Sequence, residues 1–251
     1  MDIWIYPDAN ALADAVADLI AAQLLSRPAS VFALASGKTP LAVYDELAVR
    51  VREGRTSFHA ATVFALDEYL GLGAGDRHSF ASYFDTQVFG PINLPATQGF
   101  VPDGRAADPA KECRAYEARI LAAGGVDFCV LGVGQNGHLA FNEPGPVLTA
   151  QAHIAEIADQ TRRAMSPELR GVRYGLTMGM ATILNARRVV LMASGPDKAD
   201  IITRALVPVI DPWVPASFLQ LHPNAVMALD AAAARDLAYG PSAARHAVKT
   251  P

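Results

Sequence analysis

The sequence predicts an α/β fold in which a mostly parallel sheet carries helices on both faces. Three observations predict it: short apolar runs recur along the chain, segments with helical spacing separate them, and no proline-, glycine- or serine-rich linker divides the 251 residues. Strands that alternate with helical segments of about 10–15 residues form βαβ units, in which neighbouring strands run parallel. A single domain over residues 1–251 is therefore expected.

Each element is predicted from its apolar spacing and from the residues at its ends. Asn10 and Thr39 can cap helices, and Asp108 can cap a helix that carries Pro109 in its first turn. The tail after Tyr239 is expected to fray. The predicted strands are 3–6, 31–35, 62–66, 126–133, 188–193 and 225–229. The predicted helices are 11–25, 40–51, 78–88, 109–122, 176–184, 197–205 and an alanine-rich stretch after 229.

Composition and charge exclude several classes of protein. Apolar residues make up 51% of the chain and charged residues 18%, which is typical of a folded protein with a sizeable core. The net charge is −4 without a basic run, so no nucleic-acid partner is expected. The chain has no window of 18 uninterrupted apolar residues and no basic n-region, so we expect neither a membrane span nor a signal peptide. Cys113 and Cys129 are too few for a disulfide framework or a zinc set, which favours a cytoplasmic protein.

Ligands of open parallel sheets bind beyond the carboxyl ends of the strands, so the segments that follow strands are informative. In the first of them, 36–40 (SGKTP), Gly37 allows a close turn and Pro40 suits the start of a helix. The free N–H groups at such a helix end favour phosphate. Phe32 stands where a Walker A motif requires glycine, which excludes a P-loop. Phosphate binding and a plain capped turn both remain open.

Two further segments place charged side chains after strands. Asp67 and Glu68 end an apolar strand, and a carboxylate against apolar walls can act as a base near neutral pH. The alternative is a solvated loop acid or a helix cap. Lys198 lies in the first turn of a helix, where the dipole disfavours a cation unless an anion binds there. The alternative is a surface lysine.

The loop after the strand at 126–133 carries the pattern GxGxxG between Gly132 and Gly137. A dinucleotide fingerprint must open a helix, but the pair at 144–145 is Pro-Gly, so a nicotinamide site is excluded. A histidine beside a carboxylate can serve as a proton-transfer catalyst, although a lone histidine is often structural. The remaining candidates on this loop are Asn136, His138 and Glu143.

Together these segments resemble the glucosamine-6-phosphate deaminase (isomerase) family. The matching stretches are SGKTP at 36–40, LDEY at 66–69, LGVGQNGHLAFNEPG at 131–145, LTMGMATILNA at 176–186 and PASFLQLHP at 215–223. VDFCVLGVGQNGHL and PASFLQLH are also similar to the branch that acts on galactosamine 6-phosphate. The resemblance implies a Rossmann-like domain and an aldose–ketose isomerisation with loss of ammonia, without metal or cofactor.

The resemblance also implies roles for individual residues. Asp67 would be the base that moves the C2 proton of the sugar to C1 through an enediol. His138 would open the pyranose ring by proton transfer at the ring oxygen, oriented by Asn136 and Glu143. Asn136 stands where some members carry aspartate. The ligands of the 6-phosphate would be Ser36, Gly37, Lys38, Thr39 and Lys198, and the supporting residues would be Glu68 and Gly137.

Two segments depart from the family pattern. Between residues 157 and 175, the phosphate-binding arginine of the family does not align. The candidates for it are Arg162, Arg163, Arg170 and Arg173. Regulated members carry basic and hydroxyl residues just after the FNEP segment. An ungapped alignment places there Pro146, His153, Ala155 and Glu156.

Two other functions remain as alternatives. A 6-phosphogluconolactonase shares the scaffold, but it lacks the DEY acid pair and its histidine loop does not continue as FNEPG. A sugar-phosphate sensor uses the same fold without turnover, but a regulator would also need a DNA-binding helix-turn-helix segment, for which 251 residues leave no room. The expected partner is a small sugar phosphate. The sequence leaves open whether the glucosamine or the galactosamine epimer is preferred and whether the protein is a monomer or a homo-oligomer.

Overall fold

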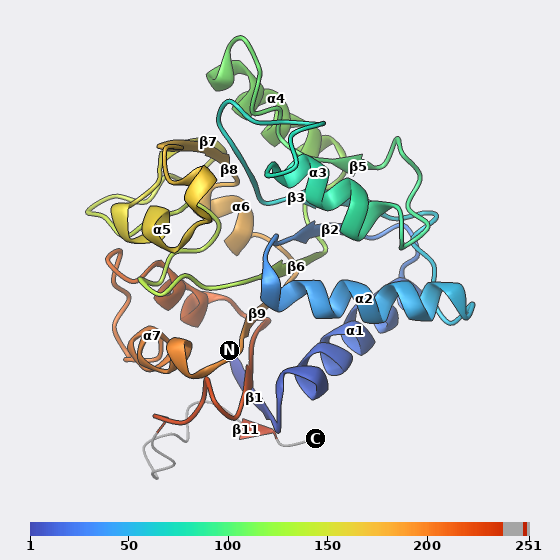
Figure 1. Cartoon of the computed structure of the whole chain (residues 1–251). Helices are drawn as coiled ribbons and strands as arrows, with labels where there is room; N and C mark the ends of the chain where they lie inside the picture. The colour runs from blue at the N-terminus through green and yellow to red at the C-terminus, as the bar shows by residue number, and fades with distance from the viewer. Residues whose placement is uncertain (238–247, 250–251) are drawn as a thin grey trace.

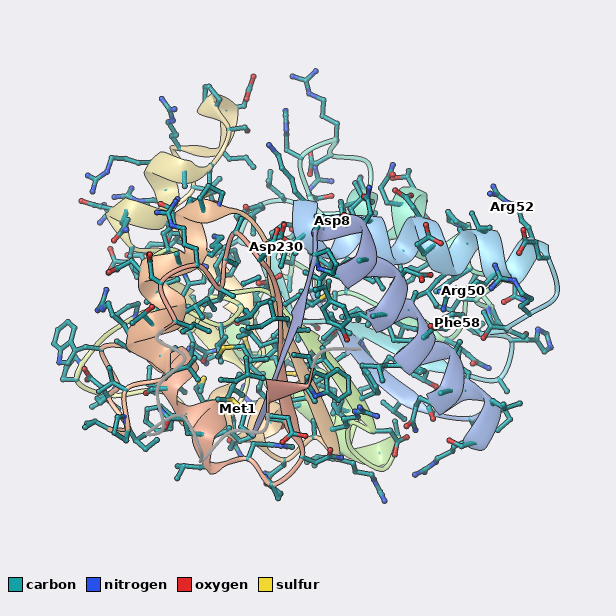
Figure 2. All side chains as sticks on the ribbon, turned by 90° about the horizontal axis from the view of Figure 1, so that it is seen from below. Met1, Asp8, Arg50, Arg52, Phe58 and Asp230 are labelled. Atoms are coloured by element: carbon teal, nitrogen blue, oxygen red, sulfur yellow. The ribbon has the colours of Figure 1, made fainter. Side chains whose placement is uncertain are left out.

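A large sheet of parallel strands organises the computed structural model, which describes residues 1–237 and 248–249 (Figure 1). In this described part the sheet has eight strands in the order β11-β1-β10-β9-β6-β2-β3-β5, and all neighbouring pairs are parallel. The strands are β1 (Asp2–Tyr6), β2 (Val31–Leu34), β3 (Thr62–Ala65), β5 (Gly99–Phe100), β6 (Phe128–Leu131), β9 (Arg188–Ala193), β10 (Ala225–Asp230) and β11 (Val248–Lys249). Figure 2 shows Asp8 and Asp230 together at one end of this sheet and Met1 at the other.

Helices cover both faces of the sheet because alternate strand residues point to opposite sides. Phe32 and Leu34 of β2 pack with α1 (Ala9–Ser26), α2 (Lys38–Arg52) and α3 (Phe80–Phe84). Val31 and Ala33 pack on the other face with α4 (Pro109–Ala122), α6 (Met180–Leu184) and α7 (Ala199–Ala205). The predicted α/β fold, with a mostly parallel sheet and helices on both faces, is confirmed.

A second, antiparallel sheet of three strands was not predicted. It consists of β4 (Asp67–Tyr69), β7 (His153–Glu156) and β8 (Tyr174–Thr177), in the order β4-β8-β7. The predicted helix at 176–184 is therefore wrong in its first part, and α6 begins only after Gly179. Backbone crowds Gly179, since a Cβ there would lie 2.2 Å from the carbonyl oxygen of Gln151. Pairing with β4 and β7 decides the conformation of 174–177, which apolar spacing alone cannot show.

Several predicted helix ends also need correction. Asp8, not Asn10, caps α1, because its carboxylate accepts the N–H groups of residues 10 and 11. Thr39 lies within α2, which begins at Lys38 after Gly37 and has no side-chain cap. Asp108 caps α4 as predicted and accepts the Lys111 N–H.

Three more helix predictions are changed by the structure. The predicted helix at 78–88 is α3 followed by a π-helical turn, Asp85–Phe89, and the one at 197–205 begins as a 3₁₀ turn, Pro196–Lys198, ahead of α7. The alanine-rich stretch at 231–237 forms turns instead of a helix, and the Asp230 carboxylate accepts the Ala233 N–H there. The predicted frayed tail lies outside the described residues, except that 248–249 pairs with β1.

Helix α1 is the one helix in the described ranges that is long and apolar enough to cross a membrane by length and composition. Leu12, Val16 and Ile20 on this helix are fully buried in the core beneath the sheet. A core helix of a folded domain meets the same criterion, and the burial of this apolar face accounts for its composition.

Candidate active site

The structure brings all four segments predicted from the sequence to one cavity. The cavity has a volume of about 890 Å³ and lies at the carboxyl ends of β2, β3, β6 and β9. The short helix α5 (Asp159–Ala164) contributes a further wall. The predicted site residues that line it are Ser36, Gly37, Lys38, Thr39, Asp67, Asn136, His138 and Lys198. Glu68, Gly137 and Glu143 lie behind this lining.

Asp67 supplies a buried carboxyl group to the cavity wall. It starts β4 one residue after β3 ends, and its relative exposure is 6%. Within the described residues its Oδ1 atom has no hydrogen-bond partner. Burial raises its pKa to about 8, with a further contribution from the neighbouring Glu68 charge. Its pKa therefore lies near physiological pH, which suits a proton acceptor.

Glu68, the next residue of the strand, faces the opposite side and binds the start of α3. Its Oε1 accepts the N–H groups of Tyr69 and Phe80 at 2.7 and 3.0 Å, and its Oε2 accepts that of Ala81 at 2.7 Å. Phe80 and Ala81 form the first turn of α3. Burial raises the Glu68 pKa, although these three hydrogen bonds oppose the rise. Both carboxylates are buried, so neither is a solvated loop acid, and Glu68 binds the start of α3 as a helix cap would.

His138 is held through one ring nitrogen. Its Nδ1 lies 2.8 Å from the Asn136 side-chain oxygen and 3.3 Å from a carboxylate oxygen of Glu143. The Asn136 amide nitrogen donates to the same Glu143 oxygen at 2.7 Å, which fixes the orientation of the amide. The Asn136 oxygen must then accept from His138, so Nδ1 carries the proton. The other ring nitrogen, Nε2, is left as the basic atom.

Glu143 stays ionised behind the histidine. Burial opposes its ionisation, but hydrogen bonds from His138, Thr161 and Asn136, together with the charge of His138, outweigh burial and lower its pKa. Its second oxygen accepts the N–H group of Ala158 at 3.2 Å, just ahead of α5. The Glu143 carboxylate thus places a negative charge beside the His138 ring.

Glycine at position 134 makes room for the histidine ring. A Cβ atom on Gly134 would lie 2.2 Å from the His138 Cε1 atom. Gly137 closes the same turn with a φ of 94°, in the left-handed region that favours glycine. The glycine pattern read from the sequence therefore shapes the pocket around a histidine and not around a dinucleotide.

We expect Gly134→Ala to lower kcat by about 10²-fold, because the added methyl group must displace the His138 ring and small misplacements of a reacting group are costly. Gly171→Ala is the control, since a Cβ atom there would meet nothing within 4 Å and Gly171 does not line the cavity. Steady-state kinetics of both variants checks this. Equal activities in the two variants would show that the ring position is not critical.

Segment 36–39 and Lys198 form another part of the cavity wall. Gly37 adopts a φ of 114° directly before α2, whose first residues line the cavity and whose start has no side-chain cap. Lys198 approaches from the 3₁₀ turn, and its Nζ donates to the Val133 carbonyl at 3.0 Å. Burial lowers the Lys198 pKa, while the Asp197 carboxylate, 3.8 Å away, opposes this. The half-buried Lys198 side chain lies inside the cavity wall, unlike a surface lysine.

Replacing Lys198 by alanine is expected to raise KM for a phosphorylated substrate by at least about tenfold, because one charge-assisted contact is lost. The wild-type KM should itself rise with ionic strength, since salt screens the attraction. Lys111→Ala on α4 is the control lysine. A KM for the Lys198 variant that matches the wild type at every salt concentration would remove Lys198 from the phosphate site.

None of the four candidate arginines lines the cavity in the described structure. Arg162 pairs with Asp159 on α5, and Arg173 pairs with Glu156 at 3.2 Å. In the same described residues, no group of three or more histidine, cysteine, aspartate or glutamate side chains is arranged to hold a metal ion.

Sequence reasoning missed three side chains that support the site. The Thr161 hydroxyl on α5 lies 3.2 Å from His138 Nδ1. The Tyr83 hydroxyl donates to the Gly37 carbonyl at 3.0 Å, in the turn before α2. Asn142 is buried beside the histidine loop. None carries a local signal, except that Asn142 stands in the FNEPG stretch.

The fold and the site define an enzyme that moves protons on a small anionic substrate. The profile of the family described as Glucosamine-6-phosphate isomerases/6-phosphogluconolactonase matches residues 7–227, and the chain belongs to this family. The resemblance seen in the sequence is confirmed. The chain is 42% identical over 243 residues to the glucosamine-6-phosphate deaminase of Shewanella loihica, covering 95% of this chain and 90% of that protein.

Solved structures of proteins with each of the two activities named in the family description resemble this chain to different degrees. A monomeric glucosamine-6-phosphate deaminase superposes with a TM-score of 0.90 at 34% identity, covering 94% of this chain and 99% of that chain. A 6-phosphogluconolactonase from Leishmania guyanensis reaches a TM-score of 0.75 at 22% identity, covering 94% and 98%. The second likeness reflects the shared fold alone.

Proposed function

We propose that the protein is a glucosamine-6-phosphate deaminase, which converts the amino-sugar phosphate to a ketose 6-phosphate and ammonia. The observation that carries this is the pairing, in one cavity, of an unpartnered buried Asp67 with a histidine whose Nδ1 is held by Asn136 and Glu143. The glucosamine-6-phosphate deaminase relatives, which align over nearly the whole chain, support the assignment.

The phosphate fixes one end of the sugar. In the proposed complex the 6-phosphate lies against segment 36–39 and Lys198, and its binding energy positions C1 and C2 beside Asp67 and His138, which line the same cavity. His138 Nε2 then takes the proton of the C1 hydroxyl and passes it to the ring oxygen, so the bond between C1 and the ring oxygen breaks and the open-chain aldehyde forms.

Asp67 acts on the open chain. The aldehyde at C1 acidifies the C2 proton, which the Asp67 carboxylate removes, and the electron pair moves to O1. The enediol-type intermediate carries nitrogen at C2. Asp67 returns the proton to C1 and a proton passes from the nitrogen to O1, which gives an imine at C2 beside a C1 hydroxyl. Water then hydrolyses the imine to the ketone and ammonia. In sum, one water is consumed and one ammonia is released.

Two other substrates compete with this assignment. The galactosamine epimer differs only at the 4-hydroxyl, so the same acid and base would serve it. A 6-phosphogluconolactone would need ring opening by water and no C2 proton transfer. Asp67, held with a raised pKa in β4, has a task in the first two reactions and none in the third.

A coupled assay for ammonia and ketose 6-phosphate decides between these substrates. We expect equal amounts of both products, with a higher kcat/KM for glucosamine 6-phosphate than for galactosamine 6-phosphate. A higher value for the galactosamine epimer would move the enzyme to that branch. Hydrolysis of 6-phosphogluconolactone without ammonia release from either amino sugar would overturn the proposal.

We further expect no activation by N-acetylglucosamine 6-phosphate, the effector of the regulated members. Residues 146–156 contain no lysine or arginine, and the nearby Arg173 is already paired with Glu156. A second phosphate normally requires paired or bidentate cations. Without an effector site there is no coupling, so initial velocity should depend hyperbolically on substrate concentration, with or without the acetylated sugar. A sigmoidal curve that the effector makes hyperbolic would contradict this.

The remaining proposals concern the setting of the enzyme. We propose that residues 1–251 act as one domain, since β1 lies between β10 and β11 in one sheet. Classification as a hydrolase, a cytoplasmic location and the absence of nucleic-acid and membrane partners stay predictions, as does the choice between monomer and homo-oligomer.

A further inference from the structure

We infer that Asn142 is a positioning residue that fixes the His138 loop relative to the strand that carries Asp67. The inference rests on the function proposed above and assigns a task to a side chain that is neither acid nor base. Asn142 is 2% exposed, does not line the cavity and comes between the histidine loop and Glu143. Its task is visible in the bonds of its amide group.

The Asn142 amide nitrogen joins two separate parts of the chain. It donates to the carbonyl of Leu139 at 2.8 Å and to the carbonyl of Met178 at 2.9 Å. Leu139 directly follows His138, and the Asn142 backbone N–H donates to the same Leu139 carbonyl at 3.0 Å. One side chain therefore closes the histidine loop and ties it to the segment after β8.

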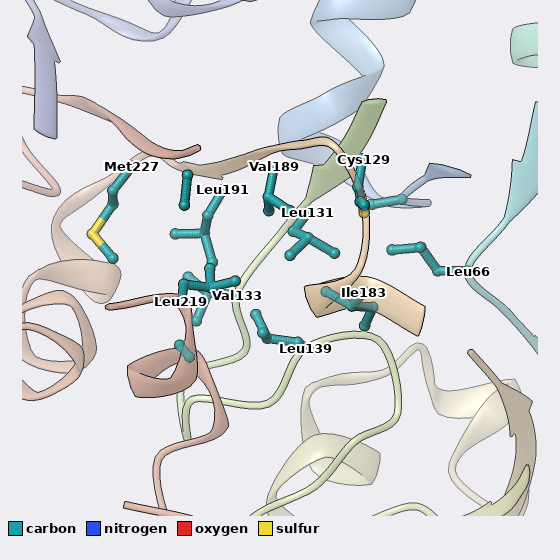
Figure 3. Close-up of a cluster of buried hydrophobic side chains, with 14 of the residues drawn as sticks. Leu66, Cys129, Leu131, Val133, Leu139, Ile183, Val189, Leu191, Leu219 and Met227 are labelled. Carbon is teal, nitrogen blue, oxygen red and sulfur yellow. The ribbon is translucent and has the colours of Figure 1, made fainter. Parts of the chain in front are cut away.

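Met178 connects this hydrogen-bonded loop to the strand that carries Asp67. Its N–H group donates to the carbonyl of Leu66 at 2.7 Å, and Leu66 directly precedes Asp67. Figure 3 shows the side chains of Leu66 and Leu139 reaching into the same apolar cluster, so packing supports the hydrogen bonds. The link from His138 to Asp67 thus runs through Leu139, Asn142, Met178 and Leu66.

The neighbouring Thr177 provides a second, weaker tie. It lies opposite Asp67 in the pairing of β4 with β8. Its hydroxyl accepts the Phe141 N–H at 3.1 Å and donates to the Met178 carbonyl at 3.2 Å. The loop and the strand are therefore joined at two adjacent positions.

The loop needs such ties because its conformation is costly. Ala140 has a φ of 50°, in the left-handed region that residues with a side chain rarely adopt. The Asn142 Oδ1 atom is itself buried without a hydrogen-bond partner in the described residues, which also costs free energy. An apolar side chain would avoid that second cost, but it would leave the Leu139 and Met178 carbonyls without their shared donor.

Asn142→Leu, which has nearly the same shape and no donor, tests the inference. Misplacement of about 1 Å can lower a rate about 10²-fold, so we expect a fall of this size in kcat with KM within about threefold of wild type. Deuterium exchange at C1 of the ketose 6-phosphate with ammonium should slow as well, because this step depends on Asp67. A loss confined to ring opening would overturn the inference, since Asn142 would then support only the histidine loop.

Asn224→Leu is the matched control. Its amide nitrogen also donates to a backbone carbonyl, that of Arg187 at 2.9 Å, but away from the cavity. Its kcat should equal that of the wild type. If Asn142→Leu fails to fold, as circular dichroism and thermal melting would show, Thr177→Val replaces it with an expected loss in kcat of about tenfold and the same KM.

An unchanged kcat in the folded variant, or a rise in KM that accounts for the whole loss, would overturn the inference. Either result overturns only the role of Asn142, because the wild type would still deaminate glucosamine 6-phosphate. Failure of the proposed function is a different result, because the wild type itself would then release no ammonia.

Discussion

Asp67→Asn is expected to lower kcat for deamination by about 10²- to 10⁴-fold while the protein keeps its fold. The amide has the shape of the carboxyl group, but it cannot accept the C2 proton. Because Oδ1 of Asp67 has no hydrogen-bond partner among the described residues, the substitution breaks no bond of that atom. Steady-state kinetics and circular dichroism check the result, with Asp85→Asn on the exposed π-helical turn as control. Wild-type turnover by the folded variant would contradict the assignment of the base.

The raised pKa of Asp67 adds a pH dependence to this prediction. The ionised form is the base, so kcat/KM at low substrate should rise with pH until about 8. The same shift acts on stability. Between the ordinary aspartate pKa of 3.8 and the raised pKa of about 8, Asp67 is protonated in the folded protein and ionised in the unfolded chain. Unfolding therefore releases a proton, so the free energy of unfolding falls as pH rises through this range. The amide in the Asp67→Asn variant does not titrate, so the melting temperature of the variant should exceed that of wild type increasingly from about pH 5 to about pH 8.

His138→Gln is expected to slow turnover of the closed pyranose by about 10²-fold or more. The reason is that Nε2 is the basic atom left facing the cavity once Nδ1 is bound to Asn136. The variant should process an analogue without the C4 and C5 hydroxyls, which can close neither a furanose nor a pyranose ring, at nearly the wild-type rate. This difference separates the task of His138 from that of Asp67, which both substrates require.

Rates of both substrates, measured with the wild type, the His138 variant and the control His59→Gln, test the assignment. His59 is exposed and does not line the cavity. Equal losses on the closed and open substrates would show that His138 acts in a step common to both, and the ring-opening role would be wrong.

Much of the candidate site follows from the sequence because parallel strands bring their carboxyl ends to one edge. The segments after β2, β3, β6 and β9 could be found without knowing how the strands are ordered, and the structure places all four around one cavity. The glycine pattern was also informative, since the Pro-Gly pair at 144–145 ruled out a long helix and left Asn136, His138 and Glu143 as candidates on the loop.

Other parts could not be predicted because they depend on contacts between distant residues. The pairing of β4 with β8 buries Asp67 and Glu68 in a strand, although acidic residues are poor strand formers. Which of the two carboxylates is free depends on the start of α3, whose N–H groups only Glu68 reaches. Thr161 approaches His138 across 23 positions of sequence, and no local pattern reports such a contact.

The most direct test of the central claim is hydrogen exchange at C1 of the ketose 6-phosphate. The ketose and ammonium are incubated with enzyme in D₂O, and the two C1 hydrogens are followed by NMR. A single base on one side of the substrate predicts that the wild type exchanges one C1 hydrogen and leaves the other, and that Asp67→Asn exchanges neither. Exchange of both hydrogens at equal rates, or exchange at the wild-type rate by Asp67→Asn, would contradict the account.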